Sequence, residues 1–284
     1  MQDLMAGERP HFDLKNINPE VINSHLRETK EMMLMYDCGI KEVKTKLEIL
    51  NNEFQIQQER NPIEYLKSRV KSLESIVKKL HKKGYMLSVE NAMKQLNDIA
   101  GIRVICSFID DIYSVADMLK KQDDITVILE KDYIKYPKPN GYRSYHMVLE
   151  VPVFFSQRKQ NVKVEVQIRT IAMDFWASLE HKLYYKETDI TSEEISGRLK
   201  KCADIIADTD AEMQSIRSVV EQWEAGNLSQ RKKEACGTTT TGFLKNLLPV
   251  EKKNSNQTEN DTEELLLCNL FSVAEDANQK EYDA

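Results

Sequence analysis

Apolar residues recur along the chain with two different periods, which predict a mixture of helices and strands. Between residues 20 and 60 they recur every three or four positions, as at Ile40, Val43 and Leu47, and this stripe is typical of an amphipathic helix. The helix should end before Asn61-Pro62, because proline disfavours helical backbone in the residue before it. Further helices are predicted over residues 72–83, with Ser72 as N-cap and Gly84 as the stop, and over 88–97, 111–121, 171–186 and 192–222.

Alternation with a period of two predicts strands in the middle of the chain. It is clearest over residues 162–169, where valine and isoleucine face one way while Glu165, Gln167 and Arg169 face the other. Residues 65–71 fit either a strand or a helix. Strands between helices predict an α+β (mixed α/β) domain with a central mixed sheet of about five strands flanked by helices. The strands are predicted at residues 101–108, 125–134, 142–153 and 162–169.

These elements divide the chain into four predicted parts. Pattern and composition predict a helical extension, a mixed domain, a closing helix that buries surface between subunits, and a polar tail that is mostly disordered. Their predicted bounds are residues 1–60, 61–187, 188–226 and 227–284.

Composition indicates a cytoplasmic protein. Apolar residues make up 41% and charged residues 30% of the 284 positions. No apolar run reaches the ~18 residues that a membrane-spanning helix needs, and the first residues carry acids without the apolar core of a signal peptide. The five cysteines are scattered without a CxxC pair, so neither a disulfide framework nor a zinc site is expected.

Charge is distributed unevenly along the chain. Residues 60–186 hold 22 Lys and Arg against 15 Asp and Glu, a balance of +7, whereas the whole chain carries −6. A basic middle between acidic flanks favours an anionic ligand, although scattered solvated lysines give the same balance. The acidic chain makes duplex nucleic acid an unlikely main target, so a small charged ligand such as a nucleotide fits better.

Two carboxylates stand where strands are predicted. Asp98 precedes the strand at 101–108, and Glu165 lies on the polar face of the last strand. Such a pair suits Mg²⁺, which prefers carboxylate oxygens together with substrate phosphates. The alternative is that Glu165 belongs to an ordinary half-exposed strand, which shows the same alternation.

Cations and tyrosines gather in two further segments. The loop KYPKPNGYRSYH (135–146) presents Lys138, Arg143 and Tyr142, and cations with aromatic faces are the components of a nucleotide site. Residues 69–79 place Arg69 and lysines around a helix start, where free N–H groups favour phosphate. Both segments are also compatible with ordinary basic surface. There is no P-loop, GxGxxG, GxSxG or HExxH motif.

Three segments in order, DIAGIRV (98–104), PNGYRSYH (139–146) and VEVQIRTIAMDFWASLEHKLYYK (164–186), resemble the synthetase domain of the RelA/SpoT family. The upstream SRVKSLESIVKK (68–79) fits the same pattern, and the likeness covers about residues 40–222. The short flanking helices resemble the small alarmone synthetases, which are stand-alone GTP pyrophosphokinases. No His-Asp pair occurs, so hydrolase activity is not expected.

The resemblance implies a nucleotidyltransferase-like synthetase fold and a Mg²⁺-dependent reaction of the stringent response. The family transfers the β,γ-pyrophosphate of ATP to the ribose 3′-OH of GDP or GTP, giving AMP and ppGpp or pppGpp. By this likeness Asp98 and Glu165 are the Mg²⁺ ligands, and Glu165 is also the base for the 3′-OH. Arg69 and Arg103 sandwich the adenine, and Arg103 is also a catalytic residue. Lys71, Ser75 and Lys79 reach the ATP phosphates.

On the acceptor side the resemblance implies that Tyr142 stacks on guanine while Asp174 and Ala177 line its edge. One position departs from the family pattern, because Lys131 stands where the family often has arginine, which keeps the charge but loses bidentate geometry. The other residues that surround the acceptor and its phosphates are Lys138, His146, Gln167 and Arg169.

Other readings stay open alongside this one. Toxin-like relatives act on adenosine nucleotides or on the 3′ end of tRNA, and a degenerate synthetase would bind nucleotide or single-stranded RNA without chemistry. The likeness also implies a homotetramer with a cleft that binds (p)ppGpp as an allosteric ligand. No membrane partner is expected. The preferred acceptor among GDP, GTP and GMP is not decided by these motifs.

Overall fold

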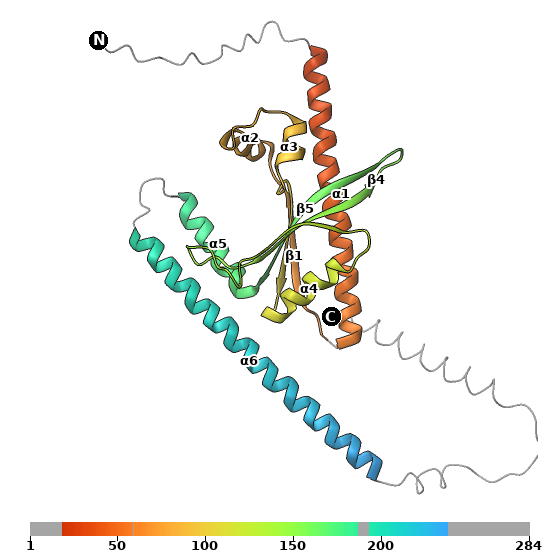
Figure 1. Ribbon diagram of the computed structural model, residues 1–284, viewed down its shortest axis with the longest axis vertical. Helices are drawn as coiled ribbons and strands as arrows, with labels where there is room; N and C mark the ends of the chain where they lie inside the picture. Colours follow the sequence, from red (N-terminus) through yellow and green to blue (C-terminus); the bar gives the residue numbers. More distant parts are fainter. Residues whose placement is uncertain (1–18, 59, 187–192, 238–284) are drawn as a thin grey trace, which may run out of the picture. The chain divides into compact units, whose positions relative to one another are not determined.

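The computed structural model describes residues 19–58, 60–186 and 193–237 (Figure 1). Of the two compact units in the chain, the first ends at Trp223 and contains every strand found among the described residues. The helices are α1 (Pro19–Gln58), α2 (Leu73–Lys82), α3 (Val89–Gln95), α4 (Ile109–Lys120), α5 (Ile171–Lys186) and α6 (Glu193–Gly237). The strands are β1 (Ile63–Val70), β2 (Ala100–Cys106), β3 (Thr126–Asp132), β4 (Tyr145–Phe154) and β5 (Lys159–Thr170).

The five strands form one mixed sheet in the order β1-β2-β5-β4-β3. β2 and β5 pair in parallel, and all other neighbours pair antiparallel. This confirms the predicted α+β class and the five-stranded sheet. It also assigns the ambiguous segment at 65–71, most of which belongs to β1.

One face of the sheet is buried by α1 and α4, which Figure 1 shows on the same side of it. The apolar residues of β5, Val162, Val164, Val166 and Ile168, are all at most 1% exposed on this face. The stripe predicted on α1 lies against them. Gly39 lets the helix approach closely, because a Cβ at this position would stand 2.7 Å from Cγ1 of Val162. Residues 19–58, predicted as a separate extension, therefore share the main core.

The expected strand over 142–153 begins three residues late. β4 starts at Tyr145, and Tyr142 and Ser144 belong to the turn before it. Gly141 has φ +88° in this turn, a left-handed conformation that glycine adopts readily. The backbone therefore turns immediately before Tyr142, and extended strand geometry begins only at Tyr145. Phe108 likewise lies beyond β2 and immediately precedes α4.

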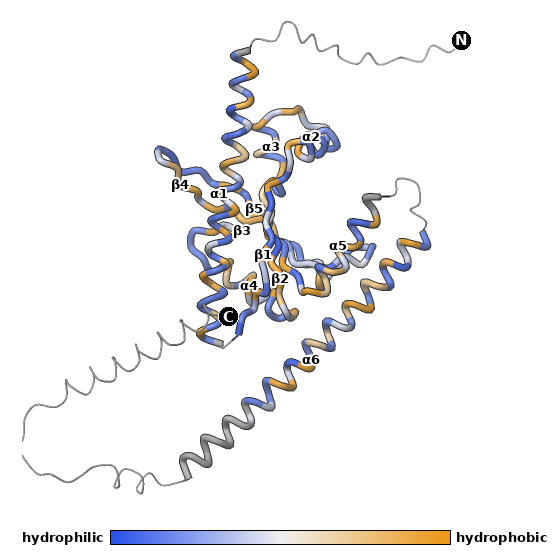
Figure 2. Tube along the Cα trace, turned by 180° about the vertical axis from the view of Figure 1, so that it is seen from behind, coloured by the Kyte–Doolittle hydropathy of each residue, from blue (hydrophilic) through white to orange (hydrophobic). Residues whose placement is uncertain are grey.

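The closing helix extends further than the predicted end at residue 226, because α6 continues to Gly237 and so includes the first residues of the predicted tail. Residues 228–235 are mostly good helix formers, which explains the longer helix. The rest of the predicted tail, residues 238–284, lies outside the described residues. Figure 2 shows apolar residues recurring along α6 between hydrophilic ones. Among the described helices, none is both long enough and apolar enough to cross a membrane.

Candidate active site

The face of the sheet opposite α1 and α4 carries a row of polar residues that crosses all five strands. Lys67 pairs with Arg103, Arg103 with Gln167, Gln167 with His146, and His146 with Lys131. Residues directly opposite each other on paired strands point to the same face. The strand register therefore brings together polar side chains that are far apart in the sequence.

A cavity of about 290 Å³ opens on this face. Four cationic side chains and two carboxylates line it, which suits a polyphosphate bound with a divalent cation. Six of the predicted site residues are among the lining. The lining residues are Lys67, Ser68, Arg69, Lys71, Asp98, Gly101, Ile102, Arg103, Glu165 and Gln167.

Asp98 is the most tightly held carboxylate in the cavity. Its Oδ2 accepts hydrogen bonds from Nζ of Lys71 at 2.5 Å and Nζ of Lys79 at 2.6 Å. Burial disfavours its ionisation, but these two ammonium groups outweigh burial and hold the pKa of Asp98 below its usual value. Its Oδ1 is buried and has no hydrogen-bond partner within the described residues. A buried, unpaired carboxylate oxygen fits a cation that the cavity would receive with its ligand.

Glu165 is the second carboxylate and lies on β5, close enough to Asp98 for the two charges to interact. Its Oε2 accepts a hydrogen bond from Nε2 of Gln167 at 2.8 Å, and its Oε1 lies 3.6 Å from Nδ1 of His146. Burial opposes its charge, yet His146 and Gln167 outweigh burial and lower the pKa of Glu165. The carboxylate is therefore ionised at neutral pH. Within the described part of the chain, no cluster of three or more His, Cys, Asp or Glu side chains suits a metal, so these two carboxylates form the candidate donor set.

A hydrogen-bonded chain leads from Glu165 toward the turn that carries Tyr142. Nη2 of Arg169 donates to the Tyr142 hydroxyl at 2.6 Å, and this hydroxyl lies 2.7 Å from Nε2 of His146. Because the ionised Glu165 carboxylate can only accept, the neutral imidazole of His146 carries its proton on Nδ1, and its Nε2 accepts a hydrogen bond from the Tyr142 hydroxyl. Burial lowers the pKa of His146 despite the neighbouring carboxylate, so the imidazole is neutral at pH 7.

Lys138 lies over two aromatic rings beside this chain. Its Nζ is 4.6 Å from the ring centroid of Tyr142 and 4.7 Å from that of Tyr133. The Arg169 guanidinium lies 5.1 Å from the Tyr142 ring. These cations hold the tyrosine by cation–π contacts as well as by hydrogen bonds.

Asp174, which the resemblance places at the edge of the base, is only 4% exposed. Its Oδ1 lies 3.1 Å from Nη1 of Arg103 and 3.1 Å from Nη1 of Arg169. Ala177, one turn further along α5, is 8% exposed and belongs to a small apolar cluster separate from the main core. The Asp174 carboxylate therefore links the two arginines in this structure.

The remaining predicted residues lie at the borders of the site. Ser75 is in the first turn of α2, where Ser72 caps the helix and donates its hydroxyl to Oγ of Ser75 at 2.8 Å. Lys131 is exposed on the edge strand β3, in register with His146.

Sequence reasoning missed Lys67, which lines the cavity and whose Nζ lies 3.9 Å from Oδ2 of Asp174. It stands two residues before Arg69 on the same strand face. Assigning residues 65–71 to a strand would have identified it.

A sheet face that places two carboxylates and several cations around a cavity of about 290 Å³ has the features of a nucleotide-binding site. The model of the family described as "Region found in RelA / SpoT proteins" matches residues 68–190. The chain is 44% identical over 210 residues to the GTP pyrophosphokinase YwaC of Bacillus subtilis (strain 168), covering 74% of this chain and 100% of that relative.

Comparison with solved structures points to the same family of enzymes. The small alarmone synthetase 2 from Bacillus subtilis is 46% identical, with a TM-score of 0.62 over 67% of this chain and 98% of the other. The small alarmone synthetase 1 from the same organism, bound to its product pppGpp, is 36% identical, with a TM-score of 0.63 over 68% of this chain and 98% of the other. The chain belongs to the RelA/SpoT family, among its small alarmone synthetases.

Proposed function

We propose that this protein is a GTP pyrophosphokinase that transfers the β,γ-pyrophosphate of ATP to the ribose 3′-OH of GDP or GTP. The observation that carries the proposal is the meeting of Asp98 and Glu165 in one cation-lined cavity. The names of its relatives, GTP pyrophosphokinases and alarmone synthetases, support the same activity.

In the proposed reaction, the 3′-oxygen forms a bond to the β-phosphorus while the bond from that phosphorus to the oxygen bridging to the α-phosphate breaks. AMP leaves with the bridging oxygen, and the products are ppGpp or pppGpp. The proton of the 3′-OH passes to Glu165, whose ionised carboxylate can accept it. Most of the rate enhancement comes from positioning and from neutralising phosphate charge.

Mg²⁺ is the proposed cofactor, held by Oδ1 of Asp98 and by Glu165. When bound, it would neutralise phosphate charge and favour attack at the β-phosphorus. The unpaired Oδ1 of Asp98 supports this assignment. Lys71 and Lys79, whose ammonium groups contact Oδ2, are placed to contact phosphate oxygens as well.

The two nucleotides occupy different parts of the site in this proposal. ATP lies over β1, β2 and α2, with adenine between Arg69 and Arg103 and its phosphates near Lys71, Ser75 and Lys79. The acceptor guanine stacks on Tyr142, with Asp174 and Ala177 at its edge. The residues that surround its ribose and phosphates are Lys131, Lys138, His146, Gln167 and Arg169.

Three further expectations belong to the proposal. The chain assembles as a homotetramer, binds (p)ppGpp as an allosteric ligand, and acts in the cytoplasm. The family likeness supports them, and light scattering at micromolar concentration tests the first.

The test of the function uses purified protein with Mg²⁺ and γ-labelled ATP, offered GDP, GTP, GMP, tRNA or no acceptor. Label on a guanine nucleotide with stoichiometric AMP is the expected result. Label on an adenosine nucleotide or tRNA would replace the acceptor assignment, and nucleotide binding without AMP release would identify a binding module.

A further inference from the structure

The turn that carries Tyr142 is attached to α6. A Cβ on Gly141 would stand 2.6 Å from Cβ of Ala203, so this turn packs closely against α6 only because residue 141 has no side chain. Nη1 of Arg143 donates to the carbonyl oxygens of Gly141 at 3.1 Å and Ala203 at 3.2 Å. Its Nη2 lies 3.3 Å from Oδ1 of Asp204. Both neighbours of Tyr142 in the sequence are therefore bound to one turn of α6.

Apolar packing holds the same turn. Trp176 of α5 is buried against Ala203 and donates Nε1–H to the carbonyl oxygen of Leu199 at 2.9 Å. The ring of Tyr142 packs against this small cluster, which is separate from the main core. The tyrosine proposed to stack on guanine thus rests on side chains of α5 and α6.

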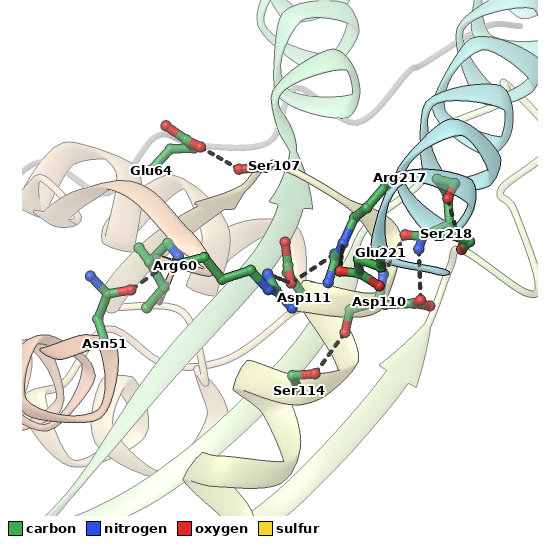
Figure 3. A network of polar contacts seen from close by, with 12 residues as sticks. Asn51, Arg60, Glu64, Ser107, Asp110, Asp111, Ser114, Arg217, Ser218 and Glu221 are labelled. Atoms are coloured by element: carbon green, nitrogen blue, oxygen red, sulfur yellow. Dashed lines mark hydrogen bonds and ion pairs between the residues drawn. The ribbon is translucent and has the colours of Figure 1, made fainter. Parts of the chain in front are cut away.

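A second contact fixes α6 to the domain further along the helix. Figure 3 shows Arg60, from the connection between α1 and β1, and Arg217, from α6, both reaching Asp111. Their Nη1 atoms lie 2.5 Å and 3.2 Å from Oδ1 of Asp111, which is fully buried. Nε2 of Gln214 also donates to Oδ2 of Asp110 at 2.7 Å. Because α6 is fixed there, its turn at residues 203–204 offers a rigid support.

We propose that Arg143 is a positioning residue for the acceptor nucleotide, which ties the turn bearing Tyr142 to α6 and does not itself bind phosphate. The inference rests on the proposed function and extends it to how the acceptor pocket is held. Sequence reasoning placed Arg143 among the cations of a nucleotide loop. Its side chain is 19% exposed, and its guanidinium is engaged by three protein oxygens.

The first test compares Arg143→Met with wild type in steady-state transfer to GMP, GDP and GTP. We expect KM for every acceptor to rise about tenfold, the scale of losing one charge-assisted hydrogen bond. The rise should be equal for the three acceptors, while kcat and KM for ATP stay within about twofold. A rise that grows with the number of acceptor phosphates would show direct phosphate binding and overturn the proposal.

Arg143→Lys separates geometry from charge. Lysine keeps the charge but cannot reproduce the planar fork that joins two carbonyls and a carboxylate. We expect it to behave like Arg143→Met. Restoration of wild-type acceptor KM by lysine would contradict the positioning role, since a phosphate contact needs only the charge.

Lys200→Gln is the matched control. Lys200 is 56% exposed, and its Nζ lies 3.4 Å from Oδ2 of Asp204, the carboxylate oxygen that Arg143 does not contact. The variant therefore changes the surroundings of Asp204 but leaves Arg143 in place. We expect wild-type kinetics. If acceptor KM rose as much in Lys200→Gln as in Arg143→Met, the positive charge near Asp204, and not the attachment of the turn, would set acceptor affinity.

Amide hydrogen exchange tests the attachment without any activity. Gly141 N–H donates to the carbonyl oxygen of Lys138 at 2.8 Å, and Tyr142 N–H to Oδ1 of Asn140 at 3.2 Å. We expect both amides to exchange at least about tenfold faster in Arg143→Met than in Lys200→Gln. Unchanged protection would overturn the inference. Failure of the proposed function would appear separately, as wild-type protein that transfers no pyrophosphate to guanine nucleotides.

Discussion

The two halves of the proposed site are built in different ways. The ATP side lies on β1, α2 and β2, within residues 63–106, and its elements join the main core through residues such as Ile76, Leu80 and Ile102. The acceptor side combines residues of β3, β4 and β5 with an outer part, which is the turn that bears Tyr142 and the start of α5. This outer part packs against one stretch of α6. It rests on a small separate cluster and on directional contacts such as that from Arg143 to Asp204, 61 residues away.

This difference teaches how each half should respond to change. Apolar burial is nondirectional, and a large core distributes a local loss over many contacts. Hydrogen bonds depend steeply on distance and angle, so a small displacement of α6 would misplace Tyr142. A change that displaces α6 should therefore alter acceptor affinity while ATP affinity stays the same.

The largest effect is expected at Glu165, which lies on the strand between the two halves. Glu165→Gln removes the charge and the basicity, so kcat should fall at least ~100-fold. Both KM values should change by only a few-fold, measured with ATP and GDP in steady state. Near-normal kcat would contradict the role as base, and a rise in one KM alone would assign Glu165 to that half.

Gly141→Ala tests the acceptor side. The residue has φ +88°, where a side chain costs about 1–3 kcal/mol, and the new Cβ would collide with Ala203. We expect acceptor KM to rise about tenfold or more while KM for ATP stays unchanged. Equal rises in both KM values would show that a displacement of the turn also disturbs ATP binding, so that the two halves are not independent.

Gly39→Ala is the matching test of the main core. The Cβ would stand 2.7 Å from Cγ1 of Val162, and overpacking of this kind costs about 1–3 kcal/mol. Alanine recovers about 1 kcal/mol of helix propensity, so a net loss near 1 kcal/mol should lower the melting temperature by a few degrees. Both KM values should remain those of wild type. A selective change in acceptor KM would break the distinction between the halves.

The smallest effect is expected at Asp210, which is 8% exposed on α6 and accepts a hydrogen bond from Oγ1 of Thr170 at 2.6 Å. Burial raises the pKa of this carboxyl, so the fold prefers the neutral acid and loses stability as pH rises through the folded pKa. Asp210→Asn cannot ionise, and its amide oxygen can still accept from Thr170. We expect urea unfolding to show a small gain in the free energy of unfolding at pH 7 that shrinks toward pH 4. A less stable variant at pH 7 would mean that the charge of Asp210 stabilises α6.

Sequence reasoning predicted the regular strands of the site better than the turn beside them. Alternation over residues 162–169 identified β5 and the shared face of Glu165 and Gln167, because a strand's period is local information. Asp98 was placed at a strand start by the same means. The orientation of Arg143 was not predictable, since it depends on contacts with residues about 60 positions later. Tyr142 was assigned to a strand because the alternating pattern of β4 extends back to this residue. The turn there became visible only in the structure, where Gly141 has a positive φ.

The central position of β5 has a consequence for how the protein is made. β5 is the last strand among the described residues, yet it lies between β2 and β4 and is their common partner. During synthesis β1 can pair with β2, and β3 with β4, but the two pairs become one sheet only after β5 emerges. Glu165 arrives on that strand. A nascent chain therefore holds neither the continuous five-stranded sheet nor a complete pair of carboxylates until β5 is added.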